Sequence, residues 1–409
     1  THSSGLNFNS DIKPLLGNDL VVSIPSVQAL NQSNSPTIVA LKTKDSGKAK
    51  TAVARGATKV GSSHGADVYK DNNDGTFSAL EDGTLVTADT RAMLGAALAR
   101  HDGSDHMTKD DFNSSLGDLD KSALVRGVAD LQTIIDSSTS AAKAKSVKYV
   151  AALRDLGFTV SAKNNSIAVD TEAKTEGLQD SDLPIASGTG SAPVVKRPGE
   201  LGLGIRDPHQ IYNFVIGALQ QTSPQSFGQF QAAKQQIGKS AGVDIDKDIV
   251  GQLTGNAAVS AATNGSGGFA ARAQLKDPAA FSTALGKLAK RLPSLGASGR
   301  VSGPKGGFYT LTRSGGSKVV FGVVGKNLVV ATDQARATAF AAQSAAPVPD
   351  AQGAVALDLD TRALVNQQLK KQGVTPLAQA LTGFLGDLTG YLRADSGATR
   401  ANFTLQLNG

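Results

Sequence analysis

The chain has 409 residues, no cysteine, and a formal net charge of +6 from 41 Lys+Arg against 35 Asp+Glu. Without cysteine it can form no disulfide, thiolate nucleophile or zinc–thiolate site. Scattered basic residues, 5% aromatics and no Trp argue against a nucleic-acid binder, and no apolar run approaches the roughly 18–20 residues that span a bilayer.

The first strong local pattern is "YKDNNDGTFSALE" (69–81), which resembles an EF-hand calcium loop. Asp74 and Glu81 fall at two of its ligand positions. Lys70, however, occupies the place of the first carboxylate, and the flanks have strand character. The tripeptide Asn-Asp-Gly at 73–75 supplies the positive-φ residues of a hairpin turn. We therefore predict a turn between two strands and no metal site.

Two short patterns resemble catalytic motifs but lack the context that those motifs need. "GSSHG" (61–65) fits G-x-S-x-G around Ser63, yet a strand follows where a nucleophile elbow requires a helix. "SDIK" (10–13) fits S-x-x-K, but the chain has neither S-D-N nor K-T-G. Both stretches are predicted to be non-catalytic.

"RHDGSDHMTKDD" (100–111) is the densest polar cluster of the sequence. Its side chains with metal-ligand chemistry are His101, Asp102, Asp105 and His106. The two histidines are five residues apart, which suits no strong motif, so we predict an exposed loop between helices. Thr108 with Asp111 three residues later resembles a capping box.

Phosphate-binding and acid–base candidates are weak as well. The Gly-rich stretches at 188–190, 202–204 and 265–268 lack the helix start that would hold a phosphate. His209 is predicted to be a first-turn helix residue rather than a base. We predict no catalytic, cofactor-binding or metal-binding residue, and hence no enzyme and no cofactor.

Five segments of the first half have counterparts, in the same order, in the second half. The pairs are 5–24 with 242–261, 40–54 with 273–286, 67–99 with 307–342, 124–131 with 353–360, and 156–174 with 388–409. Where the first copy has the calcium-like loop, the second has Arg313-Ser-Gly-Gly316, which keeps a turn but no ligands. The order predicts two tandem copies of one module.

The period of the apolar residues and the positions of cap and turn residues predict the helices and strands of each module. "TRANFTLQL" (399–407) alternates apolar and polar residues, which is typical of a strand. Helices are expected after Asp207-Pro208 and Asp277-Pro278, with Asp89 and Asp333 as further N-caps. The fold class is therefore predicted as α+β, each module a mostly antiparallel sheet with helices packed on one face.

The predicted domain boundaries follow the repeat. Residues 1–182 form a first module that is truncated at its N-terminus, and 183–200 form a Gly, Pro and Ser-containing linker. Residues 201–409 form a second module with a helical preface at 207–238. Because the sequence starts at Thr1 rather than Met, we expect that any signal peptide or anchor has been removed.

The run Asp11–Gly17, Lys44-Asp45, "LVTADTRAMLGAALAR" (85–100) and "GDLTGYLRAD" (386–395) resembles the bacterial domain-of-unknown-function family 3352, common in actinobacterial lineages. The resemblance implies an envelope protein, carried on a membrane anchor or lipoprotein signal, with its soluble part outside the cytoplasm, or a secreted protein. It brings no activity and no site residues.

Three hypotheses remain open. The first is a non-catalytic envelope protein that binds a lipid or other apolar ligand, which an apolar cavity would favour. The second is a surface or adhesion module that contacts cell wall or a protein, which a filled core and a broad exposed patch would favour. The third is an unrecognised hydrolase, which requires Ser63 or His101 to meet a carboxylate in a pocket.

Overall fold

The computed structural model describes residues 19–24, 36–104, 106–137, 143–263, 268–292, 299–372 and 383–408. It divides into two compact units, Thr1–Asp111 (unit 1) and Phe112–Gly409 (unit 2). The S-x-x-K stretch at 10–13 and the repeat segment 5–18 lie outside the described residues. Within the described ranges, no helix is both long and apolar enough to cross a membrane.

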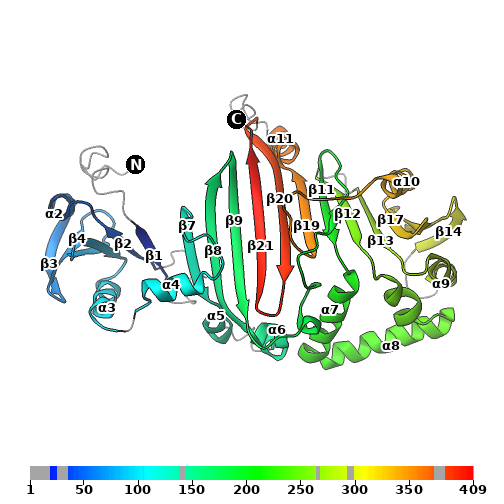
Figure 1. Ribbon diagram of the computed structural model, residues 1–409, viewed down its shortest axis with the longest axis horizontal. Helices are drawn as coiled ribbons and strands as arrows, with labels where there is room; N and C mark the ends of the chain where they lie inside the picture. The colour runs from blue at the N-terminus through cyan, green and yellow to red at the C-terminus, as the bar shows by residue number, and fades with distance from the viewer. Residues whose placement is uncertain are drawn as a thin grey trace. The chain divides into compact units, whose positions relative to one another are not determined.

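Unit 1 is built on a six-stranded antiparallel sheet (Figure 1). In spatial order its strands are β1 (Leu20–Ser23), β2 (Ile38–Lys42), β6 (Thr84–Ala88), β5 (Phe77–Glu81), β4 (Ala66–Asp71) and β3 (Ala57–Ser63). Its helices are α2 (Ser46–Gly56) and α3 (Arg91–Asp102), and α4 (Lys109–Ser115) crosses into unit 2. Leu94 and Leu98 of α3 pack on Val68 and Ala79, so one face of the sheet carries the core.

Unit 2 contains a thirteen-stranded antiparallel sheet in which β21 and β9 lie side by side (Figure 1). In spatial order the strands are β14 (Gly299–Lys305), β15 (Phe308–Arg313), β16 (Lys318–Val324), β17 (Asn327–Ala331), β13 (Phe269–Gln274), β12 (Ala257–Ala262), β11 (Glu200–Ile205), β19 (Val355–Asp360), β20 (Leu385–Ala394), β21 (Ala398–Leu407), β9 (Ser166–Thr175), β8 (Leu153–Lys163) and β7 (Val125–Asp130). A separate two-stranded sheet pairs β10 (Pro193–Val194) with β18 (Ala346–Pro347).

Along the sequence, the helices of unit 2 alternate with groups of these strands. They are α5 (Leu131–Ser137), α6 (Lys148–Ala151), α7 (Pro208–Thr222), α8 (Pro224–Ala241), α9 (Pro278–Arg291), α10 (Gln334–Ala342) and α11 (Thr361–Gln372). Helices α7 and α8 occupy the range predicted as a helical preface. Phe340 of α10 is fully buried against Phe308 and Val329, which forms a core at this end of the sheet. Antiparallel sheets with interspersed helices confirm the α+β class.

The two large sheets share one strand order. Unit 1 runs β1-β2-β6-β5-β4-β3, and one end of the sheet in unit 2 runs β12-β13-β17-β16-β15-β14. The three-strand runs β7-β8-β9 and β19-β20-β21 also correspond, and they meet where β9 pairs with β21. This correspondence supports duplication, which stays a prediction.

The compact units do not follow the predicted boundaries at 183–200. Strands on both sides of that segment belong to one sheet, because β9 pairs with β21 over nine residues from Ala398↔Lys174 to Gln406↔Ser166. The segment is also packed, since Leu183 and Val195 are fully buried. It is therefore a structural part of unit 2 and not a free linker.

Two of the four aspartates predicted as helix N-caps make capping bonds. Asp277 and Asp333 accept backbone N–H groups at the starts of α9 and α10. At α3 the cap is Thr90, whose Oγ1 accepts from Met93 N–H at 3.2 Å, so the prediction of Asp89 was wrong. The Asp89 carboxylate instead accepts the backbone N–H of Thr37, a contact that draws it away from the helix.

Of the other two predicted caps, one lacks its capping bond and one forms both of its bonds. Asp207 takes the N-cap position of α7 in a left-handed conformation, with φ of 48°, but its side chain makes no capping bond. The capping box of Thr108 and Asp111 is confirmed, because each side chain accepts the other's backbone N–H at 2.9–3.1 Å.

The calcium-like segment forms a hairpin turn between β4 and β5, as predicted. Asp71 Oδ1 accepts the N–H groups of Asn73 and Asp74, and Asp74 Oδ1 accepts that of Thr76. These carboxylates thus satisfy the turn's own backbone. Gly75 has φ of +79°, the left-handed region that its place in the turn requires.

Candidate functional site

One face of the large sheet in unit 2 carries rows of apolar side chains across seven strands. Residues opposite one another on neighbouring strands share a face, so the registers define its membership. We call this surface the apolar face. Its members are Leu201, Leu203 and Ile205 of β11, Leu359, Leu357 and Val355 of β19, Leu388 and Leu392 of β20, Leu405, Phe403 and Ala401 of β21, Ile167, Val169 and Thr171 of β9, Ala162, Val160 and Phe158 of β8, and Val125 of β7.

Every one of these side chains is half-buried or exposed. Exposure reaches 36% for Leu201, 38% for Ile167 and 50% for Val125. At one end of the apolar face, Val355 and Leu392 pack against the same buried hydrophobic cluster as Ile211 of α7 and Tyr149. The rest leaves aliphatic surface open to a binding partner.

The opposite face, which we call the polar face, carries polar residues, and several of them are buried. Thr159, Glu172, Ser260 and Asp358 are all less than 9% exposed. Covering segments approach closely at glycines. A Cβ on Gly202 would lie 2.6 Å from Val194 Cγ1, and one on Gly157 would lie 3.1 Å from the Leu116 Cα. Residues 192–195 and 112–119 therefore pack directly on this face.

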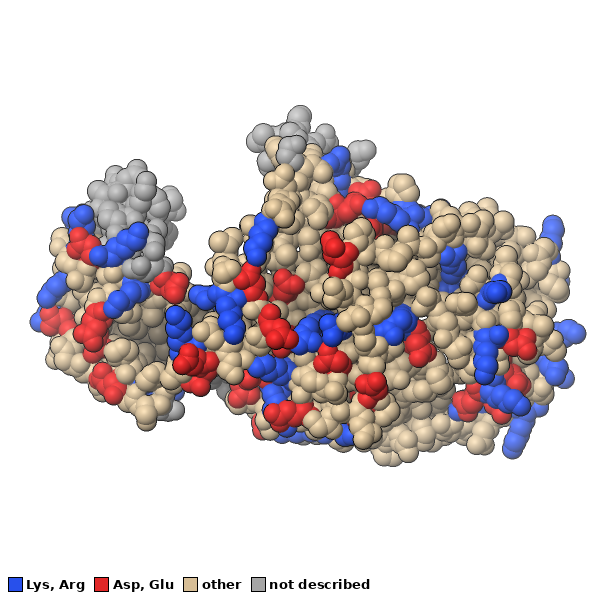
Figure 2. All heavy atoms as spheres, viewed as in Figure 1, with Lys and Arg blue, Asp and Glu red and all other residues tan. Residues whose placement is uncertain are grey.

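Charged side chains pair on the polar face, and Figure 2 shows acidic and basic side chains interspersed over the middle of the sheet. Arg400 contacts Glu172, Asp395 and Asp118, each at 2.9 Å. Lys196 bridges Asp358, at 3.2 Å, and Asp387.

Burial raises the pKa of Asp358, and the neighbouring Lys196 opposes that rise. Desolvation opposes the charge of Lys196, but its hydrogen bonds to Asp387 and Asp358 outweigh this and raise its pKa. The two shifts indicate a partly desolvated ion-pair network that is internally compensated, which is a structural arrangement.

A cleft of about 410 Å³ in unit 2 is polar. It is lined by Asp130, Gln132, Arg154, Asp155, Lys174, Thr175, Glu176 and Gly397. Arg154 Nε donates to Glu176 Oε2 at 3.0 Å across this site. Such a lining suits water or a small charged solute and not an apolar ligand.

Ser63 ends β3 and is followed by His64, with φ of 51°, and Gly65, after which β4 begins. The motif is therefore strand–turn–strand, which confirms that it is not a nucleophile elbow. His64 Nδ1 lies 3.0 Å from Asp102 Oδ2 and is 38% exposed.

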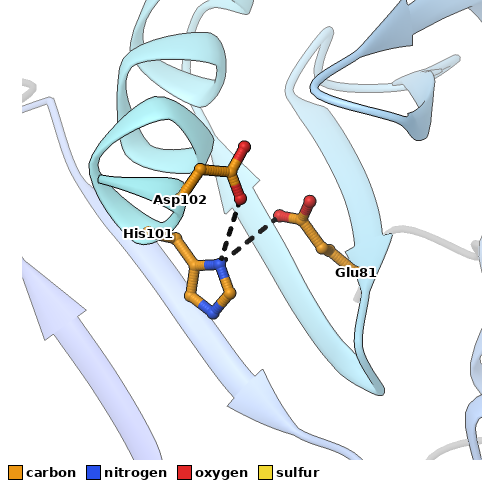
Figure 3. A group of neighbouring side chains, drawn as sticks. All are labelled: Glu81, His101 and Asp102. Atoms are coloured by element: carbon orange, nitrogen blue, oxygen red, sulfur yellow. Dashed lines mark ion pairs between the residues drawn. The ribbon is translucent and has the colours of Figure 1, made fainter. Parts of the chain in front are cut away.

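His101 and Asp102, at the end of α3, meet Glu81 at the end of β5 (Figure 3). His101 Nδ1 lies 3.6 Å from Asp102 Oδ1 and 4.0 Å from Glu81 Oε2. The three ligand atoms are close enough together for one cation. His101 is 61% exposed, however, so the cluster has the geometry of a solvated ion-pair group at a helix end.

The remaining candidates are separate from that cluster. His106 Nδ1 lies within 3.1 Å of the carbonyl oxygens of Arg100 and Gly103, so it closes the end of α3. His209 Nδ1 lies 3.3 Å from Asn213 Nδ2 one turn along α7. Asp105 lies outside the described residues.

One family model, described as "Protein of unknown function (DUF3352)", matches residues 1–297, more than half of the chain. The chain belongs to the DUF3352 family. No curated protein and no solved structure matches it. The DUF3352 match runs across the boundary between units 1 and 2.

Sequence reasoning missed two features of this DUF3352 protein. The glycines at 202 and 204, considered as a phosphate loop, instead lie in β11 and admit residues 192–195. Arg206 donates to the carbonyl oxygens of Ser187 and Gly190, so the Gly-rich stretch 188–190 is a clamped loop. The alternation of residues in 200–205 could have predicted the strand. No local pattern in the sequence indicates that Arg206 bonds to the loop at 187–190.

Proposed function

We propose that this DUF3352 protein is a non-catalytic, extracytoplasmic envelope protein that binds an apolar ligand, such as a lipid acyl chain, on the apolar face of unit 2. The observation that carries the proposal is the set of aliphatic rows from β11 to β7 whose side chains stay half-buried or exposed. Burying an aliphatic side chain from full exposure gains about 1.5–3 kcal/mol, and these half-buried side chains would each gain a part of that, so a ligand that covers several would bind.

The remaining geometry supports binding rather than catalysis. Neither Ser63 nor His101 lines the polar cleft. His101 does lie near the carboxylate of Glu81, but its side chain is exposed there. The polar cleft of unit 2 is lined mainly by polar and charged residues, among them the Arg154–Glu176 pair. A fatty acid or phospholipid chain lying along the apolar face would contact several strands at once.

A second function is favoured by a different observation. Leu20, Val21 and Val22 of β1 are 60%, 56% and 58% exposed, and Leu124 beside β7 is 76% exposed. Such surfaces at sheet edges suit an interaction module that contacts a protein partner.

The first test is native mass spectrometry of the protein purified from its host's membrane and wall fraction, with denaturing extraction of any bound lipid. In parallel, the purified protein is titrated with the fluorescent fatty acid cis-parinaric acid. Ile167→Glu places a charge on the apolar face and should weaken binding at least about tenfold. Gln406→Glu, an exposed position on the polar side of β21, is the matched control and should bind normally.

The outcomes separate the two functions. Saturable binding that only Ile167→Glu weakens supports the apolar ligand. A protein that carries no lipid and does not bind the probe, yet still co-purifies with wall material or a protein, would refute it and favour the interaction module.

A further inference from the structure

The two large sheets have four end strands, and these fall into two kinds. In unit 1 the end strands are β3 and β1, and in unit 2 they are β14 and β7. Exposed edges of sheets recruit further strands unless a charge, a proline or a bulge blocks them.

Strands β3 and β14 carry such protection. On β14 the pairing shifts register between Ser302 and Lys305, and Pro304, which lacks an N–H, lies within the shift. On β3 the register shifts between Lys59 and Gly61, and Lys59 is exposed.

Strands β7 and β1 carry exposed aliphatic residues instead. Leu124 and Val125 are 76% and 50% exposed at the start of β7, and β7 pairs with β8 without a register shift. Within the described residues, β7 pairs with β8 alone and β1 with β2 alone. β1 contains neither proline nor a charged residue, and β7 contains no proline or lysine, although it carries Arg126, whose Nη1 donates to Lys121 O, and Asp130.

Comparison of the shared strand order shows that the edges of β1 and β7 lack a neighbour that their counterparts have. By position, β1 corresponds to β12 and β7 corresponds to β19. In unit 2, β12 and β19 are the two neighbours of β11, which pairs antiparallel with each of them. The edges without a bulge or a proline are therefore those of the strands whose counterparts flank β11.

We propose that the edge of β7 is a binding site for an extended peptide segment with the chemistry of β11, which adds as an antiparallel strand. The occupant is about six residues long, like β11, with an aliphatic side chain at every second position. In β11, Leu201, Leu203 and Ile205 lie on the apolar face opposite Leu359, Leu357 and Val355. Equivalent side chains beside β7 would cover Val125. The edge of β1, taken by itself, has the same character.

This site goes beyond the proposed ligand, because it uses backbone hydrogen bonds along the edge of β7 and touches the apolar face only at Val125. The two can be separated experimentally. Leu124→Lys, at a position beside β7 that is not part of the apolar face, should impair peptide binding and leave binding of cis-parinaric acid by Ile167 and its neighbours unchanged.

The probe is a fluorescein-labelled peptide with the sequence of residues 200–207, ELGLGIRD, titrated with the full chain and followed by fluorescence anisotropy. Val125→Lys and, separately, Leu124→Lys add a charge to the β7 edge and should weaken binding at least about tenfold. Ser302→Lys on the protected edge β14 is the matched control and should not. A scrambled peptide controls for composition, and thermal melts establish that each variant is folded.

Saturable binding that either β7 variant weakens, and that Ser302→Lys leaves intact, supports the proposal. No binding to the wild type would overturn it. Equal binding by the β7 variants would also overturn it, because the peptide would then occupy another place, such as that of β11. A wild-type dimer in sedimentation that Val125→Lys dissociates would assign the edge to a second copy and overturn the peptide assignment.

Discussion

Arg400 is the residue whose loss should test the polar face most directly. Its Nε donates to Glu172 Oε2 at 2.9 Å, and the two residues are direct partners across β21 and β9. The Glu172 side chain is 4% exposed, and that of Arg400 is 25% exposed. Arg400→Met removes the cation and keeps a similar apolar stem. The carboxylate of Glu172 would then be buried without a charged partner.

The magnitude follows from burial. Removing one partner of a buried ion pair costs about 3–5 kcal/mol, because the remaining charge is left without compensation. Water reaches a quarter of Arg400, so we expect the lower end, about 3 kcal/mol of unfolding free energy. Asp118 contacts the same guanidinium but is 83% exposed, so Asp118→Asn should cost at most about 1 kcal/mol.

The assay is urea unfolding followed by far-UV circular dichroism and by tyrosine fluorescence, since only Tyr69 of the five Tyr lies in unit 1. The double variant Arg400→Met/Glu172→Leu removes both charges and should recover most of the loss. If Arg400→Met costs less than about 1 kcal/mol, or if the double variant is as unstable as the single one, then Glu172 is not a buried charge that depends on Arg400.

Three further predictions are independent of that pair. Thr90→Ala should lower the unfolding free energy of unit 1 by about 1 kcal/mol because it removes the cap of α3, and an unchanged melting curve would contradict this. Burial raises the pKa of Asp358 in the folded state, so the wild type should lose stability relative to Asp358→Asn as pH rises from about 4 towards 7 in urea titrations, and a constant difference would oppose it. Zinc titrated calorimetrically should give no saturable heat, whereas a one-to-one isotherm that His101→Ala abolishes would establish a metal site at Glu81, His101 and Asp102.

The strands and most helix starts were predictable because their signals are local. Alternation in 400–407 corresponds to β21, and Asp277 before a proline marks α9. The error at α3 has a tertiary cause. Asp89 and Thr90 are both good capping residues, and Asp89 is occupied by the N–H of Thr37, which is 52 positions away in sequence.

The polar cluster at 100–111 shows why side-chain partners were harder to predict. Its composition suggested ligands within one loop. The structure instead brings His64 and Glu81 to the end of α3 from two other elements. Nothing in the local spacing around His101 carries that information, because it depends on how β3, β4 and β5 return beside the helix.

The same limit applies to the large sheet, where it bears on function. Alternation shows that Phe403 and Arg400 lie on opposite faces, but not which face other segments will cover. A sheet optimised for stability alone would bury the face of Phe403, because aliphatic and aromatic burial is the main favourable term in folding. Here residues 112–119 and 192–195 cover the face of Arg400 and Glu172, where charges must be paired, and the apolar face keeps part of its surface accessible. Accessible apolar rows are what binding of an apolar ligand requires, and this supports the apolar face as the site that we propose for the ligand.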